Sequence, residues 1–474
     1  MIAAFVAVMA LSLLIALWAR RGAGQGPRAF FVAGGQLGAI LFFFLSVGET
    51  YSIATMLGFP GGVYAGGDGF VVWFFGYILL AAPVLAVLGP WIWRAGNLYG
   101  AVTIPDFFAA HFNSRLLERV IALGAIALLV PIGTMQFAGI RLVLGALAPG
   151  MPMPLLLAGA GLVTMAYVAL AGLRAAAFVA VLKDALMLGA ILLVGALALL
   201  HWPGAAMPTA PAASVTPVPV SLSFALSTIA VQALGFAMIP QNWAFLFAAR
   251  GPQAIVRAQA AAPLYMVMFP LLMAVAVFAR RMGLPVAKAD FVFLAAAQQL
   301  LPGWALGVVM AAVVLAGMVI LSSVCLAIAP LLTRNVLPGL DGRAQQRWAQ
   351  GVTALFIALS AAGAMAQVPL LAMLNTVFYF GIVQTLPGFL AALWTGRARA
   401  GGVLAGIAVA ALAIIGMRLA GISAGGINPG LVGLILNAAV LVLATLAFPR
   451  RDGVSVPALW RARAQDQSCG GLSR

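Results

Sequence analysis

Apolar runs long enough to cross a lipid bilayer recur from one end of this 474-residue chain to the other, with short polar segments between them. A helix needs about 20 mostly apolar residues to cross the hydrocarbon core. A membrane β-barrel would instead show alternation within segments of about ten residues. We therefore expect an all-α polytopic membrane protein. The pattern predicts about thirteen transmembrane helices, over residues 1–19, 36–59, 70–93, 121–147, 154–171, 175–200, 222–247, 262–279, 304–332, 349–366, 369–394, 402–420 and 428–448.

The second predicted span is interrupted by a polar cluster, Gly48-Glu49-Thr50-Tyr51-Ser52. A charge at mid-bilayer depth costs at least ~3 kcal/mol, so Glu49 should face protein or water rather than lipid. Glycine and hydroxyl residues also suit a break in the helix, which is tolerated where the freed backbone groups line a cavity. We expect Glu49 to face Arg141 or Lys183. The alternative is a small-residue packing seam in which Glu49 belongs to a buried structural pair.

The seventh predicted span carries a similar interruption. It contains Gln232 and is broken by Pro240-Gln241-Asn242. Proline removes a backbone donor and pushes the preceding residue out of helical geometry. Two spans of the chain are therefore predicted to be broken helices.

The charge of the chain is strongly basic, with 25 Lys+Arg against 9 Asp+Glu and a formal net charge of +16. The arginines gather in loops after odd-numbered spans, which places the N-terminus outside and residues 449–474 in the cytoplasm. A cluster after the eighth span, Arg280, Arg281 and Lys288, departs from this rule. The bilayer therefore accounts for the basic charge, and no nucleic-acid partner is expected. The first apolar run has its arginines after it, which favours a retained span in the cell membrane over a signal peptide.

Residues that could carry catalysis or bind a cofactor are scarce. The sequence has two histidines and two cysteines, and Cys325 and Cys469 define neither a disulfide framework nor a metal site. We therefore expect neither an enzyme nor a cofactor. A channel would favour a ring of charged pore residues over two broken helices. A sensor would need an appended signalling domain, for which the polar tail is too short.

Six motifs now point to a family, in the order FFVAGGQLGAI, GFPGGVY, TIPDFFAAHFNSR, ALAGLRAAAFVAVLKD, FAARGPQAIVRA and LAIAPLLTRN. In order and spacing the chain resembles the sodium:solute symporter family over roughly residues 28 to 395. The resemblance implies an inverted repeat of five plus five helices, with a broken first helix in each repeat. The repeats would cover residues 36–201 and 222–394, with an extra helix over 1–19 and two further helices over 402–448. The broken helices then coincide with the two interrupted spans.

The function that follows is secondary active transport, in which a solute:cation symporter moves a small polar solute by alternating access. By resemblance, the expected substrate-binding residues are Thr50, Thr55, Gln232 and Phe236. The family handles sugars, amino acids, carboxylates, vitamins and urea, and no residue here selects among them. A regulatory protein that uses the same fold is the runner-up.

The coupling ion is where the sequence departs from its family. By the register of LAIAPLLTRN, the two hydroxyl residues that ligate sodium in the family fall on Val319 and Ile320, which offer only backbone oxygen. The family's acidic residue falls on Ala180. Three positions on stands Lys183, whose ammonium can take a cation's place and suits proton coupling. The residues expected to take part in ion coupling are Gly48, Glu49, Tyr51, Lys183, Ala316, Val319, Ile320, Ser322 and Ser323.

Two alternatives remain open for this site. Lys183 could simply be held by its neighbour Asp184, or Ser322 and Ser323 could bind sodium through a shifted register. The coupling ion is therefore either sodium or a proton.

Overall fold

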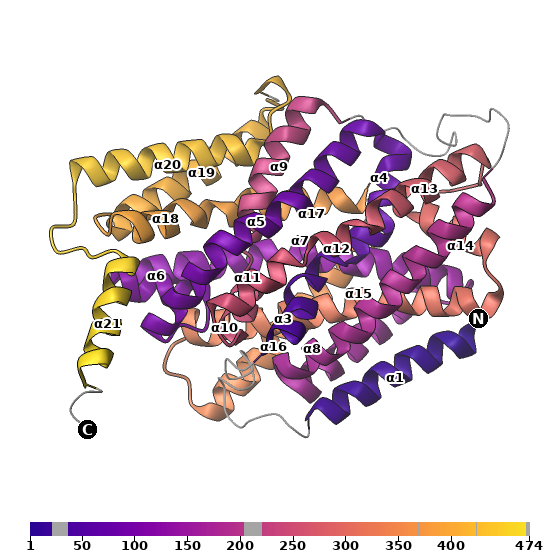
Figure 1. The fold of residues 1–474 in the computed structure, drawn as a ribbon, viewed down its shortest axis with the longest axis horizontal. Helices are drawn as coiled ribbons and strands as arrows, with labels where there is room; N and C mark the ends of the chain where they lie inside the picture. Colours follow the sequence, from indigo (N-terminus) through magenta and orange to yellow (C-terminus); the bar gives the residue numbers. More distant parts are fainter. Residues whose placement is uncertain (21–36, 203–219, 367–369, 423, 471–474) are drawn as a thin grey trace.

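The structure is a computed structural model that describes residues 1–20, 37–202, 220–366, 370–422 and 424–470. In this part of the chain the regular elements are helices, arranged as a bundle (Figure 1). The principal helices are α1 (Ile2–Arg20), α3 (Ala39–Ser46), α4 (Phe59–Gly66), α5 (Asp68–Tyr99), α6 (Ile104–Phe112), α7 (Arg115–Leu147), α8 (Met153–Leu200), α9 (Leu222–Phe236), α10 (Pro240–Ala248), α11 (Pro252–Ala260), α12 (Pro263–Met266), α13 (Met268–Arg281), α14 (Val292–Leu300), α15 (Gly303–Pro330), α16 (Gly342–Gly363), α17 (Leu371–Ile382), α18 (Leu386–Trp394), α19 (Ala400–Leu419), α20 (Pro429–Ala447) and α21 (Val456–Gly470).

The prediction of an all-α polytopic membrane protein is confirmed. Within the described ranges, nine helices are long and apolar enough to cross a membrane, or up to eleven if each of two bent pairs counts as one span. The fifth predicted span corresponds to the first part of α8, the shorter apolar stretch Met153–Val168, and the tenth to α16, whose first turns are polar. The count of thirteen, the orientation and the repeat boundaries stay predictions. Residue 36 of the second predicted span, residue 369 of the eleventh and residues 471–474 of the predicted tail lie outside the described residues, as do 367–369 within the second predicted repeat.

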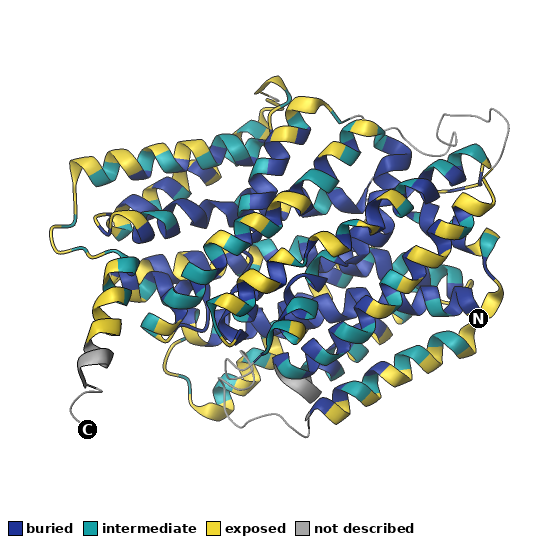
Figure 2. Cartoon of the chain, in the orientation of Figure 1, coloured by how far each residue is buried: buried dark blue, intermediate teal, exposed yellow. Residues whose placement is uncertain are grey.

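Helix α15 is the centre of the bundle, and 94% of its apolar window is buried. It packs against α1, α7 and α8, and the dark blue of buried residues is concentrated around it in Figure 2. Helices α1, α19 and α20 lie at the periphery, where only 17% to 22% of their windows are buried. Apart from Arg418 near the end of α19, the residues that they expose are apolar, so their outer faces suit contact with lipid.

Both predicted helix breaks are confirmed. The pair 39–50 and 54–66 is bent by 42°, and the pair 222–236 and 240–248 by 44°. In the first break, the 3₁₀ turn η2 (Gly48–Thr50) ends at Tyr51, which has φ −83° and ψ 83°. In the second, Ile239 is extended at φ −66° and ψ 128°, as expected for a residue before proline. Each break leaves backbone carbonyls without their intrahelical partners.

The segment between α13 and α15, residues 282–302, packs against α4, the second half of the first broken helix. We call this segment the connector. Gly61 of α4 lies so close to this connector that a Cβ there would stand 2.7 Å from the carbonyl oxygen of Ala289. The next residue, the buried Asp290, accepts a hydrogen bond of 3.0 Å from the backbone N–H of Leu371 at the start of α17. The connector therefore joins α4 to α17.

This arrangement predicts a pH dependence for Asp290. Burial raises the pKa of its carboxyl to about 7, although the Leu371 N–H and Lys288 act in the opposite direction. The folded state then holds the proton more tightly than the unfolded state. The contribution of this group to the free energy of unfolding is therefore largest below pH ~3.9, the unfolded pKa. It is lost as the pH rises to about 7, and the total change is on the order of 4 kcal/mol.

We expect Asp290→Asn to remove this dependence, because the amide keeps an acceptor for Leu371 and carries no titrating proton. The measurement is the thermal midpoint in detergent at pH 5 and pH 8. The variant should gain on the wild type at pH 8 only. An equal difference between the two proteins at both pH values would contradict the assignment.

At the opposite end of the bundle, Asn335 follows α15 and joins it to α6 and α7. Its Nδ2 donates to Asp106 at 2.6 Å and to Glu118 at 2.9 Å, and its Oδ1 accepts from Thr103 at 2.8 Å. Thr103 and Asp106 also form the capping box of α6. We call these four residues the Asn335 network. It lies on the side predicted to be cytoplasmic.

Candidate functional site

A small cavity of about 40 Å³ lies between the two broken helices. A volume of about 10–15 Å³ on this measure holds one water, so the cavity holds a solute of only a few heavy atoms. Its lining comes from the first break, α5, α7, the second break, α15 and α17. The lining residues are Glu49, Thr50, Ser52, Ala54, Tyr77, Ile132, Met135, Gln136, Phe236, Ile239, Gln241, Ile320, Asn375, Phe378 and Tyr379.

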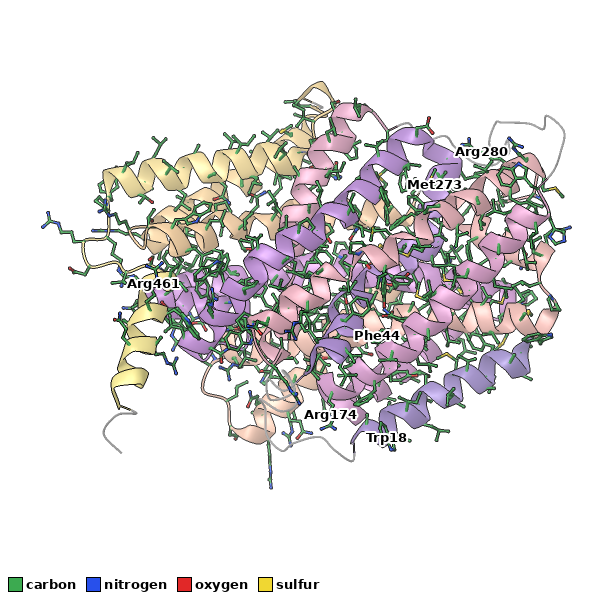
Figure 3. All side chains as sticks on the ribbon, viewed as in Figure 1. Trp18, Phe44, Arg174, Met273, Arg280 and Arg461 are labelled. Carbon is green, nitrogen blue, oxygen red and sulfur yellow. The ribbon has the colours of Figure 1, made fainter. Side chains whose placement is uncertain are left out.

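Glu49 is the one acidic residue of this lining, and the lining contains no Lys, Arg or His. Its Oε1 accepts a hydrogen bond of 3.1 Å from Nε2 of Gln241 on α10. No basic side chain of the described residues lies within 4.0 Å of its carboxylate oxygens. Basic side chains lie elsewhere, and Figure 3 shows Arg280 and Arg461 near opposite ends of the molecule. The cavity therefore holds a carboxyl group without a cation.

Two amide groups of the lining have unused hydrogen-bonding capacity. Gln136 on α7 is 1% exposed, and its Oε1 has no partner among the described residues. The Oε1 of Gln241 likewise has no hydrogen-bond partner among the described residues. A buried polar atom without a partner costs about 1–3 kcal/mol, so native structures normally supply a protein, water or ligand partner. These atoms suit a polar ligand in the cavity.

A second polar centre, Lys183 on α8, lies against the first break. Its Nζ donates to the carbonyl oxygens of Gly48 at 2.6 Å and Tyr51 at 3.1 Å, and it stands 2.9 Å from Oδ1 of Asp184. Lys183 and Asp184 are 1% and 2% exposed. The ammonium group makes two hydrogen bonds to carbonyl oxygens and one ion pair with a carboxylate. The ammonium thus occupies the position of an oxygen-liganded cation.

The neighbouring groups hold this centre tightly. The hydroxyl of Tyr265 donates to Oδ2 of Asp184 at 3.1 Å, and the rings of Tyr265 and Tyr51 meet edge to face at 4.2 Å. Gly48 is required by this packing, since a Cβ there would overlap Oδ2 of Asp184 and lie 3.1 Å from its Cγ. The pair Lys183–Asp184 is therefore fixed against the broken helix.

The predicted substrate residues are only partly brought together. Thr50 and Phe236 line the cavity. Thr55 instead donates its hydroxyl to the carbonyl of Thr50, and Gln232 accepts a bond of 2.9 Å from the indole of Trp73. Neither of these two lines the cavity. Other residues that line the cavity were not predicted from the sequence, among them Tyr77, Gln136, Asn375 and Tyr379. A lone Gln136 or Asn375 inside an apolar span is itself a signal of function.

The predicted ion-coupling residues divide into separate groups. The carbonyls of Gly48 and Tyr51 contact Lys183, whereas Glu49 and Ile320 face the cavity. Val319 and Ser322 line a different small space beside Tyr167, and Ala316 is buried within α15.

Two expectations about the partners of these residues need correction or restriction. The pairing of Glu49 with Arg141 is wrong, because Nη1 of Arg141 donates to the carbonyls of Ala364 and Met365 at 2.6 and 3.3 Å. Lys183 has its salt bridge with Asp184, and it acts on Glu49 only through its charge. The hydroxyls of Ser322 and Ser323 donate to carbonyls of their own helix, at 2.7 and 3.2 Å. Neither serine bonds to the break, so a shifted sodium site gains no support.

Known proteins agree with this architecture. A solved structure of a Na⁺-coupled sialic acid symporter, in a substrate-bound outward-open state, matches with a TM-score of 0.72 at 15% identity, and covers 95% of this chain and 98% of that chain. At such an identity the likeness shows the fold alone. The chain is 27% identical over 386 residues to the uncharacterized symporter YhjB of Bacillus subtilis, covering 79% of this chain and 76% of that protein.

A second relative is the monocarboxylate transport permease protein of Rhizobium johnstonii, 28% identical over 393 residues and 79% covered in both proteins. The family model for the sodium:solute symporter family matches residues 30–395. The match covers most of the chain and includes both broken helices. The chain therefore belongs to the sodium:solute symporter family, and it is a solute:cation symporter of the membrane.

Proposed function

We propose that this symporter is independent of sodium, that its coupling cation is the proton, and that its solute is a small monocarboxylate. The observation that carries the proposal is the position of Lys183. Its ammonium donates to the carbonyls of Gly48 and Tyr51 and pairs with Asp184 at the first helix break.

The reason for sodium independence is the competition for oxygen ligands. A hard cation binds oxygen atoms of carbonyl, hydroxyl and carboxylate groups. Here the two carbonyl oxygens at the break already accept hydrogen bonds from Lys183, and its charge is paired with the carboxylate of Asp184, while Val319 and Ile320 bring no side-chain oxygen. A sodium ion would have to displace a tethered charge of the same sign. The proton is then the cation left for coupling.

Two observations support a small monocarboxylate. The relative from Rhizobium johnstonii is a monocarboxylate transport permease protein and aligns over 79% of both chains. The cavity, at about 40 Å³, also suits a solute of a few heavy atoms rather than a sugar. Polar groups from the break and from α5, α7, α10 and α17 face this space.

Uptake into proteoliposomes tests the proposal. With ¹⁴C-pyruvate as the probe, an inward proton gradient should drive accumulation in choline medium. A sodium gradient imposed at constant pH and voltage should add nothing. Strong stimulation by sodium under these conditions would overturn the proposal and favour the sodium-coupled reading of the family.

A further inference from the structure

We infer that Glu49 carries the coupling proton, and that a carboxylate solute binds in the central cavity with one proton held between its own carboxylate and that of Glu49. This inference rests on the proposed function, because it takes a monocarboxylate as the solute. The proton is assigned to Glu49 in the cavity, whereas the Lys183 ammonium stands where a sodium ion would otherwise bind.

The charge of the cavity limits what it can bind. Its lining has one carboxyl group and no basic side chain, and Oε1 of Glu49 is bonded only to Gln241 among the described residues. From α8, Lys183 and Asp184 bring charges of opposite sign, and these two side chains pair with each other. From α5 and α17 come the phenols of Tyr77 and Tyr379. The walls from α7, α9, α10 and α15 contribute no charged side chain.

A second ionised carboxylate in the cavity would be repelled by Glu49. Two ionised carboxylates a few ångströms apart in a medium of low dielectric repel strongly. Two carboxyl groups that share a site instead share a proton and titrate as a pair. A carboxylate solute can therefore bind beside Glu49 only with one proton between the two groups.

The other polar side chains of the cavity lining are uncharged. Gln136 is 1% exposed, and its Oε1 has no partner. A carboxamide donates through Nε2 and only accepts through Oε1, so it is Nε2 of Gln136 that can donate to the solute oxygen that does not face Glu49. Asn375 and Tyr77 share only a long bond of 3.4 Å with each other and can also turn to the ligand. The cavity thus offers neutral donors for the carboxylate and a single acid for the proton.

A balance of charge follows. The empty cavity with ionised Glu49 carries one negative charge. The loaded cavity holds two carboxylates and one proton, so it carries the same net charge. One proton enters with each anion, and the binding step is electroneutral. Uptake should respond to a pH gradient and not to a potential imposed with valinomycin and potassium.

Calorimetric titration of the purified protein with pyruvate tests this inference. Repeating the titration in buffers of different ionisation enthalpy, from pH 5.5 to 8.5, gives the number of protons bound with each ligand. For the wild type we expect this number to approach one at the alkaline end, with a ten-fold loss of affinity per pH unit there. No proton uptake and a flat affinity across the range would overturn the inference.

Two variants of Glu49 assign the proton. Glu49→Gln should bind pyruvate with no proton uptake and with an affinity independent of pH. Glu49→Asp keeps a carboxyl group and should keep the proton uptake, with a displaced pH profile. Wild-type proton uptake in Glu49→Gln would overturn the assignment. If Glu49→Gln does not bind, the profile of Glu49→Asp decides, and an unchanged profile counts against Glu49.

Failure of this inference can be distinguished from failure of the proposed function. Sodium-stimulated uptake would refute the role given to Lys183 but would leave the proton count of the cavity unchanged. If no proton is bound with the ligand and transport is still independent of sodium, only the role given to Glu49 is refuted. If no member of a series of short monocarboxylates binds, the solute class is wrong and this inference falls with it.

Discussion

Lys183→Ala is expected to abolish transport and to lower the stability of the protein, and added sodium is expected to restore part of that stability. The variant leaves Asp184 buried and unpaired, at 2% exposure. Loss of one partner from a buried ion pair typically costs about 3–5 kcal/mol. The carbonyls of Gly48 and Tyr51 also lose their donor.

The gain from sodium has a specific reason. The truncated side chain vacates a space that faces two carbonyl oxygens and the carboxylate of Asp184. These are the ligand types that a hard cation prefers. A bound ion stabilises the folded state in proportion to the logarithm of its concentration above the dissociation constant. The lost ammonium and an added sodium ion are therefore interchangeable in this prediction.

The measurement is the thermal midpoint in detergent, with sodium chloride compared to choline chloride at equal ionic strength. Lys183→Ala should be far less stable than the wild type in choline and should gain in sodium. The wild type should show no difference between the salts. The other lysine of the sequence, Lys288, lies in a connector, and Lys288→Ala serves as the control. A wild type stabilised by sodium as strongly as the variant would contradict the prediction.

Gly48→Ala is expected to have the second-largest effect. An added Cβ would overlap Oδ2 of Asp184, which is itself held by Lys183 and Tyr265. Overpacking of a tight interior typically costs about 1–3 kcal/mol. Here it also pushes the carboxylate away from the ammonium, so transport should be lost along with stability.

Gly38→Ala is the matched control at the other end of the same helix. Gly38 precedes α3 with φ −67° and ψ 165°, and a Cβ there would meet nothing within 4 Å. Expression, thermal midpoint and pyruvate uptake of the two variants should be compared side by side. Equal behaviour of the two variants would show that contact with Asp184 does not explain the glycine at position 48.

The breaks in the two spans could be predicted from the sequence because their causes are local. A polar cluster in one span and Pro240 in the other interrupt the helix whatever surrounds them. The position of Lys183 could be predicted in outline, since the register of a neighbouring motif and one turn of helix fix where it lies. Its three oxygen partners could not, because two are backbone atoms of another element.

The failures have the opposite cause. Charge alone suggests that Arg141 pairs with Glu49, but carbonyl oxygens just after α16 accept hydrogen bonds from its guanidinium instead. Thr55 and Gln232 find partners in the protein, so they are not free to face the cavity. Gln136, Asn375 and Tyr379 stand on helices far apart in the sequence, and only the packing of these helices brings them to one cavity.

The Asn335 network concentrates the connection between three helices in one side chain. One carboxamide group binds two acids on α6 and α7, so its withdrawal breaks both contacts in a single event. A hydrogen bond to a charged group contributes about 1.5–3 kcal/mol, and each 1.4 kcal/mol changes a population ratio about ten-fold. Loss of this one side chain therefore removes two hydrogen bonds to charged groups at once, and a single residue determines how firmly α6 and α7 are held to the end of α15.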